Sequence, residues 1–277
     1  MSITAIDKEY VAGTYGRFPV ELVSGKGSRL TAADGKEYID LGSGIGVTCF
    51  GFGDEAWTKA VCDQAMKLQH VSNLYYTEPC ARLAKLLCEK TGMKKVFFAN
   101  SGAEANECAI KVARKYSAMK KGADCYTIVT LVNSFHGRTL TTLAATGQDH
   151  FHKDFQPLTP GFAHVPANDI EALTEAVATL NPAGILLECV QGEGGVNPLD
   201  IAFVQKVAAL CAKRDWLLLI DEVQTGVGRT GSLFAFQQFG INPDAVSFAK
   251  GIGGGLPFGG VRANEKCSQD TTPDSHG

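Results

Sequence analysis

The chain has 277 residues, of which 45% are hydrophobic and 20% are charged, and this is enough for one large domain with a sizeable core. The formal net charge of −3, without long runs of like charge, argues against a surface for nucleic acid or anionic membranes, and the sequence has neither an apolar run of membrane-spanning length nor a signal-peptide core. The nine cysteines are scattered and form no C-x-x-C pair, which predicts reduced thiols of a cytoplasmic protein and no metal site.

The first third of the chain predicts a small antiparallel sheet, a glycine-rich loop and two helices. Two turn signals divide residues 21–41 into two or three short strands. Five glycines within residues 42–53 indicate a loop where the backbone passes close to another group. Apolar residues at helical spacing predict helices over residues 54–69 and 78–91, and Asp54 is a suitable N-cap for the first of them.

A strand, a turn of small residues and a long helix follow at residues 95–121. The strand is KVFFA, the turn is Asn-Ser-Gly-Ala, and the helix reaches about residue 121. The first N–H groups of such a helix and the positive end of its dipole face the turn, which suits an anion. Gly102 lets the backbone approach closely, and Ser101 can cap the helix and donate a hydrogen bond. Taken alone, Ser-Gly-Ala is more typical of an ordinary capped helix than of an anion site.

Apolar segments and helical segments alternate over residues 95–250. Further short apolar runs at residues 126–132, 183–190, 216–220 and 245–249 predict strands, and helical patterns lie between them. This alternation is typical of a mostly parallel sheet with helices on both faces. The sequence contains no internal repeat and no low-complexity tract.

Two of these predicted strands deliver a carboxylate and an amine. The run at residues 216–220 is followed by Asp221 and Glu222, and the run at residues 245–249 is followed by Lys250 and a glycine-rich turn. Open α/β sheets bind ligands at the carboxyl ends of their strands. A desolvated lysine can act as a neutral amine on a carbonyl, and a buried aspartate can hold a cationic ring nitrogen, the two groups that a pyridoxal phosphate enzyme needs. Taken singly, Asp221 could cap the next helix and Lys250 could be a surface lysine.

The longer motifs around these residues resemble a known family. The strings IDEVQTGVGRTG, FAKGIGGGLPFGG, VFFANSGAEANECAIKVARKY, NSFHGRTLTTLAATG and LQHVSNLYYTEPCARLA are all similar to the class III, or ω-, pyridoxal-phosphate aminotransferases. The resemblance covers residues 13 to about 264 and is strongest to the branch that acts on acetylornithine. It implies the type I fold of pyridoxal-phosphate transferases, and pyridoxal 5'-phosphate as the cofactor.

The resemblance also implies roles for individual residues. Lys250 forms the Schiff base with the cofactor and then moves the proton, while Asp221 keeps the pyridine nitrogen protonated. Gln224 hydrogen-bonds the phenolate oxygen of the cofactor. Arg138 binds the substrate α-carboxylate, and Glu193 is a gate that can pair with an arginine of a further domain. The remaining cofactor contacts are Ser101, Gly102 and Ala103 at the phosphate, Phe135 stacked on the ring, and Glu222 and Val223.

The same resemblance suggests a domain division. Residues 1–50 form an N-terminal segment with short antiparallel strands, residues 51–264 form the large cofactor-binding domain, and residues 265–277 form a truncated linker. In the family a smaller C-terminal domain follows, so we expect that this domain is missing from the chain. A cytoplasmic homodimer without nucleic-acid or membrane partners is expected.

The expected reaction is transamination between N2-acetylornithine and 2-oxoglutarate in arginine biosynthesis. Ornithine, 4-aminobutyrate and succinyldiaminopimelate aminotransferases share the cofactor machinery and remain alternatives. An alternative of another class is a truncated domain that keeps the fold but is catalytically impaired. Cofactor absorbance together with a turnover assay distinguishes this alternative from an active transaminase.

Overall fold

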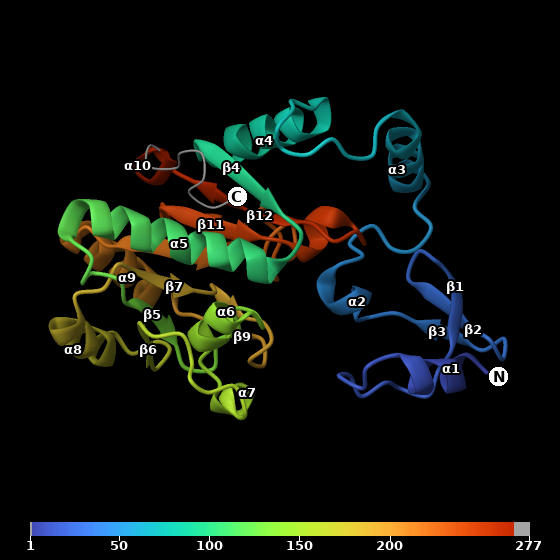
Figure 1. Cartoon of the computed structure of the whole chain (residues 1–277), viewed down its shortest axis with the longest axis horizontal. Helices are drawn as coiled ribbons and strands as arrows, with labels where there is room; N and C mark the ends of the chain where they lie inside the picture. The colour runs from blue at the N-terminus through green and yellow to red at the C-terminus, as the bar shows by residue number, and fades with distance from the viewer. Residues whose placement is uncertain (1, 269–277) are drawn as a thin grey trace. The chain divides into compact units, whose positions relative to one another are not determined.

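The computed structural model describes residues 2–268; residue 1 and residues 269–277, which include most of the linker predicted at residues 265–277, lie outside this range. The chain divides into two compact units, Met1–Ser72 and Asn73–Gly277 (Figure 1). This division does not test the domain boundaries placed at residues 50 and 264, which stay predictions. None of the described helices combines the length and apolar character needed to cross a membrane.

The first unit contains the antiparallel sheet that the turn signals predicted. Its strands pair in the order β1-β2-β3, each antiparallel to its neighbour. Asp54 caps the helix after the glycine-rich loop, because its carboxylate accepts a hydrogen bond of 2.8 Å from the N–H of Trp57. The elements of this unit are α1 (Ile3–Tyr10), β1 (Leu22–Lys26), β2 (Arg29–Ala32), β3 (Glu37–Ile39), α2 (Ser43–Gly46) and α3 (Glu55–Lys67).

A seven-stranded sheet forms the centre of the second unit. The strand order is β4-β12-β11-β10-β7-β5-β6, and β12 runs antiparallel to the other six strands. The predicted α/β fold with a mostly parallel sheet is therefore confirmed. The strands are β4 (Lys95–Ala99), β5 (Ile128–Leu131), β6 (Phe162–Val165), β7 (Gly184–Leu187), β10 (Leu217–Asp221), β11 (Ala245–Phe248) and β12 (Gly259–Ala263).

Helices cover both faces of this sheet (Figure 1). The long helix α5 (Gly102–Lys121) packs on β12, β11, β10 and β4, and α4 (Glu78–Thr91), α8 (Ile170–Leu180) and α9 (Ile201–Arg214) contribute to the core on the other face. The unit also contains α6 (Leu140–Ala145), α7 (Asp149–His152), α10 (Glu265–Ser268), the short 3₁₀ helices η1 (Ala235–Gln238) and η2 (Lys250–Gly253), and the two-stranded ribbon β8 (Val190–Gln191) and β9 (Asn197–Pro198).

The residues of β10 alternate between the two faces. Leu217 and Leu219 pack with the α5 core, whereas Leu218 and Ile220 pack with the core that contains α9. All four side chains are at most 2% exposed, and burying each one stabilises the fold by about 1.5–3 kcal/mol. Because side chains in a strand alternate, the next residue, Asp221, is placed on the α5 face.

Six strands end at the same edge of the sheet. Strands β4, β5, β6, β7, β10 and β11 run in one direction, since β12 is antiparallel to both β4 and β11. The chain leaves the carboxyl ends of five of them, all except β6, as short segments that carry most of the predicted site residues. The segments are residues 100–103, 132–138, 188–195, 222–225 and 249–255.

Candidate active site

The carboxylate of Asp221 lies at the end of β10, on the face of the sheet that α5 covers. Its Oδ2 atom accepts hydrogen bonds from Nδ2 of Asn106 at 2.7 Å and from Nδ1 of His136 at 2.8 Å. Its Oδ1 atom accepts a hydrogen bond from the N–H of Val223 at 2.9 Å. The residue is 3% exposed, so these donors fix its position in surroundings of low dielectric, where they act strongly.

Asn106 and His136 are site residues that the sequence analysis did not identify. Because a carboxylate can only accept, the hydrogen bond assigns the proton to Nδ1 of His136. Asn106 also donates from Nδ2 to the carbonyl oxygen of His136 at 2.8 Å. In the sequence, the signal for Asn106 is a polar residue on the apolar stripe of α5 that contains Ala109, Ile110 and Ala113.

Lys250 follows β11 and begins η2. Its backbone φ of 51° lies in the left-handed region that residues with a side chain seldom adopt. Burial lowers the pKa of its ammonium group, and the negative charges of Asp221, Glu188 and Glu193 oppose that shift. A lowered pKa increases the fraction of neutral amine, the form that attacks a carbonyl. The structure thus brings Lys250 and Asp221 to one site.

The start of α5 lies next to the end of β10. Ser101 is the N-cap, and its Oγ atom accepts from the N–H of Glu104 at 3.2 Å and donates to Oε2 of Glu104 at 2.8 Å. Its hydroxyl is therefore engaged in capping. The N–H groups of Gly102 and Ala103 lie in the first helical turn, where backbone donors have no partner within the helix. These two amides are the donors that the turn offers to an anion.

Gly102 is required by the packing between α5 and the segment after β10. A Cβ atom on Gly102 would lie 2.7 Å from Cγ1 of Val223, which is closer than carbon atoms pack. Since the N–H of Val223 also bonds to Asp221, this contact joins the helix start to the buried carboxylate.

Replacing Gly102 by alanine should therefore weaken both the fold and anion binding at the helix start. We expect a loss of about 1–3 kcal/mol in unfolding free energy, the usual cost of overpacking, together with weaker binding of pyridoxal 5'-phosphate. Denaturant unfolding and a cofactor titration measure the two effects. Gly13→Ala is the matched control, because a Cβ at Gly13 meets nothing within 4 Å. Equal behaviour of the two variants would contradict the prediction.

The segment after β5 carries Phe135 and Arg138. The N–H of Phe135 donates to Oε2 of Glu188 at 3.1 Å. The guanidinium of Arg138 lies over two rings, 5.5 Å from the centroid of Phe135 and 4.7 Å from that of Phe151. The two rings are themselves in edge contact, with centroids 5.7 Å apart. Arg138 is exposed, so its charge is available to a ligand.

The segment after β7 carries Glu188 and Glu193. The predicted strand over residues 183–190 ends earlier than expected, at Leu187, and Glu188 turns inward, where Oε1 accepts from the N–H of Gly192 at 3.2 Å. A Cβ on Gly192 would overlap the side-chain amide of Gln224, so that amide packs against this segment. The exposed Glu193 accepts from Nε2 of Gln148 at 2.6 Å.

Glu188 was missed by the sequence analysis, although a carboxylate inside the apolar run GILLECV was a usable signal. Burial raises the pKa of Glu188 to about 7, and the positive potential of His136 opposes the shift. The two N–H donors that it accepts also tie the Phe135 segment to the Gly192 segment.

Glu188→Gln should flatten the pH dependence of stability. The pKa of Glu188 is raised from its ordinary value of 4.5 to about 7 in the fold, so between these values the folded state holds the extra proton. The stabilising contribution is therefore complete at acidic pH and is lost as the pH rises through about 7, at about 1.4 kcal/mol per pKa unit. Urea unfolding of both proteins at about pH 5 and about pH 8 tests this. The readout is the difference in unfolding free energy between the two pH values. The NH2 group of the introduced glutamine would also face one of the two backbone N–H donors, and taking the difference removes this effect. The same fall in both proteins would overturn the prediction.

The side chain of Glu222 is not brought to the other predicted site residues. It is fully buried; Oε2 accepts from the hydroxyl of Thr225 at 2.5 Å and Oε1 accepts from the N–H of Phe236 at 2.7 Å. Strand alternation explains this, since Glu222 lies on the opposite face of the sheet from Asp221.

Within residues 2–268, no group of three or more histidine, cysteine or acidic side chains is placed to hold a metal ion.

Comparison with known proteins places the chain among transaminases. The family model of class-III aminotransferases matches residues 10–277. The acetylornithine aminotransferase of Haemophilus ducreyi is 54% identical over 99% of this chain and 70% of that protein, and the one of Methanocaldococcus jannaschii is 47% identical over 98% and 68%.

Solved structures agree with this placement. The ornithine aminotransferase of Toxoplasma gondii superposes with a TM-score of 0.94 at 31% identity, over 99% of this chain and 66% of that one. The N-acetylornithine aminotransferase of Stenotrophomonas maltophilia superposes with a TM-score of 0.83 at 37% identity, over 98% and 67%. The chain thus spans about two thirds of the length of its relatives. It belongs to the class-III aminotransferases.

Proposed function

We propose that this chain binds pyridoxal 5'-phosphate and transfers an amino group from N2-acetylornithine to 2-oxoglutarate. The substrate is supported by the names of several relatives that are 44–54% identical to the chain. A cytoplasmic homodimer is part of the same proposal. It rests on the resemblance to the family and on the scattered cysteines.

The residues at the sheet edge suit this cofactor. The amides of Gly102 and Ala103 and the dipole of α5 would hold the phosphate. Phe135 would cover one face of the ring, and Gln224, packed against Gly192, would meet the phenolate oxygen. The fit is supported by the close contact of Gly102 with Val223, which brings the helix start and the Asp221 carboxylate together without a side chain between them.

When bound, the cofactor supplies an electron sink for the carbanion that proton loss from the substrate leaves. The chain itself must orient the substrate and move a proton. Asp221, fixed by Asn106 and His136, would keep the ring nitrogen protonated. Lys250 would carry the proton from one carbon to another, a task for which a lowered pKa is suited. Arg138 would hold the α-carboxylate with its planar guanidinium.

The observation that carries the proposal is the position of Lys250, an amine with a lowered pKa at the same sheet edge as the fixed carboxylate of Asp221. A substrate panel tests it. Cofactor-loaded protein should convert N-acetylornithine and 2-oxoglutarate to glutamate with a higher kcat/KM than it shows for ornithine, 4-aminobutyrate or succinyldiaminopimelate. A preference for any of those three would replace the proposed substrate. No turnover with any of the four amino donors would refute the activity.

A further inference from the structure

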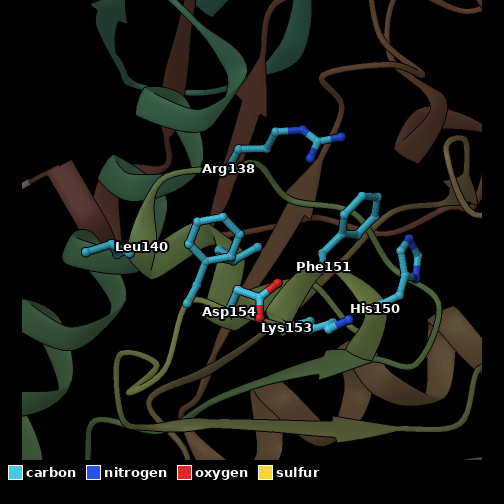
Figure 2. Close-up of a pocket in the computed structure, with 8 residues that line it drawn as sticks. Arg138, Leu140, His150, Phe151, Lys153 and Asp154 are labelled. Atoms are coloured by element: carbon cyan, nitrogen blue, oxygen red, sulfur yellow. The ribbon is translucent and has the colours of Figure 1, made fainter. Parts of the chain in front are cut away.

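A cavity of about 350 Å³ opens beside Arg138 in the second unit (Figure 2). It lies between the start of α6 and the segment that contains α7. Leu140 and Leu143 of α6 form one part of its wall, and Phe151 and Phe155 form another. This volume is at the lower end of the range for small-molecule sites.

The cavity adjoins the residues of the candidate active site. The Arg138 guanidinium lies 4.7 Å from the centroid of Phe151, a wall residue, and 5.5 Å from that of Phe135. The rings of Phe135 and Phe151 are in edge contact. A ligand whose carboxylate is bound by Arg138 therefore has its neighbouring substituents next to the cavity.

We propose that this cavity is the subsite for the N-acyl group of the amino donor. The inference rests on the proposed function. In an N-acylated amino acid the acylamino group and the carboxylate are bonded to the same carbon, so a carboxylate held by Arg138 brings the acyl group to this cavity. The apolar walls receive the acyl methyl group, whose burial is favourable.

The charges around the cavity favour an acylated amine over a free one. Arg138 and Lys153 are cationic, Asp154 is anionic, and His150 completes the ionisable lining. The charges of Arg138, Lys153 and Asp154 sum to one net positive charge, which opposes a protonated α-amino group and not a neutral amide. The subsite thus separates N-acetylornithine from ornithine by charge as well as by shape.

The test compares two exposed leucines in cofactor-loaded protein. Leu140, 63% exposed, lines the cavity, and Leu86, 51% exposed, lies on α4 away from it. Leu140→Ala should raise the KM for N-acetylornithine by about three- to tenfold, the factor for one lost methyl contact, with little change in kcat. The KM for glutamate, which carries no acyl group, should change no more in Leu140→Ala than in Leu86→Ala.

A second variant tests the charge. Lys153→Glu should raise the kcat/KM for ornithine relative to that for N-acetylornithine, because it reverses the net charge of the lining. Calorimetric titration with the two amino acids gives the same comparison without turnover. An unchanged ratio in Lys153→Glu would refute the electrostatic part of the proposal.

The outcomes separate this inference from the proposed function. If the unsubstituted protein uses N-acetylornithine, and Leu140→Ala raises the KM for N-acetylornithine and for glutamate equally, or raises neither, the cavity is not the acyl subsite. If the unsubstituted protein turns over glutamate but neither binds nor transaminates N-acetylornithine, the proposed substrate is wrong and the acyl subsite is wrong with it.

Discussion

Lys250→Ala should reduce transamination by at least about a hundred- to ten-thousandfold, the range that a positioned proton-transfer group contributes. The loss follows from two roles for one amine, which attaches the cofactor and moves the substrate proton. Burial lowers the pKa of Lys250, so more of it is neutral near neutral pH than of an exposed lysine. Lys250 is the only lysine in the segments that follow β10 and β11, residues 222–225 and 249–255.

The attachment is measured directly. After reduction with borohydride in the presence of pyridoxal 5'-phosphate, peptide mapping should find the cofactor on Lys250. Lys206→Ala, which removes an exposed lysine of α9, is the matched control and should keep both the labelling and the activity. Labelling of another lysine with Lys250 left free would refute the assignment, and so would normal turnover by Lys250→Ala.

The fold was largely predictable because its strands are short, apolar and separated by helical segments. β4 and α5 begin where the sequence placed them, at Lys95 and just after Ser101. The hydrophobic runs at residues 216–220 and 245–249 also correspond to strands, each within one residue. These elements are specified locally, by periodicity and by a capping residue, so a single sequence reveals them.

The partners of Asp221 were less predictable because they depend on distant contacts. His136 and Asn106 are 85 and 115 residues away along the chain, so the sequence around Asp221 does not indicate that they bind it. Glu188 lies in an apolar run whose strand ends at Leu187, three residues earlier than its hydropathy suggested. A carboxylate in that run was a signal of a buried acid, but the N–H donors that bind it come from segments that only the folded sheet brings together.

Strand alternation could have placed Glu222. Two adjacent carboxylates after one strand point to opposite faces, so only one of them can face α5. The Glu222 carboxylate is instead buried with the core that includes Arg262, whose guanidinium lies 3.5 Å from the centroid of Phe234. Burial lowers the pKa of Arg262 to about 9 and also raises the pKa of Glu222. An arginine within a buried strand was not anticipated from the pattern GGVRA.

Asp221→Asn should leave cofactor binding detectable and remove most proton-transfer chemistry. A neutral amide cannot hold the ring nitrogen in its protonated form, and the loss of a close buried charge pair costs about 2–5 kcal/mol. This corresponds to a rate lower by on the order of thirty- to several-thousandfold. Both carboxylate oxygens of Asp221 accept hydrogen bonds, Oδ1 from the N–H of Val223 and Oδ2 from Asn106 and His136. The NH2 group of an asparagine at this position would therefore face a donor in either orientation.

Variants of His136 separate the charge of Asp221 from its positioning. Asparagine at position 136 can still present an N–H to the Oδ2 atom of Asp221, which the histidine Nδ1 reaches at 2.8 Å, whereas leucine cannot. His136→Asn should therefore keep more activity than His136→Leu, and the pH at which the absorption of the bound cofactor changes should move further in His136→Leu. Asp221→Asn should remain the most impaired of the three, because only that variant removes the negative charge. Normal turnover by Asp221→Asn would refute the role of Asp221, and equal spectra of the two His136 variants would refute that of His136.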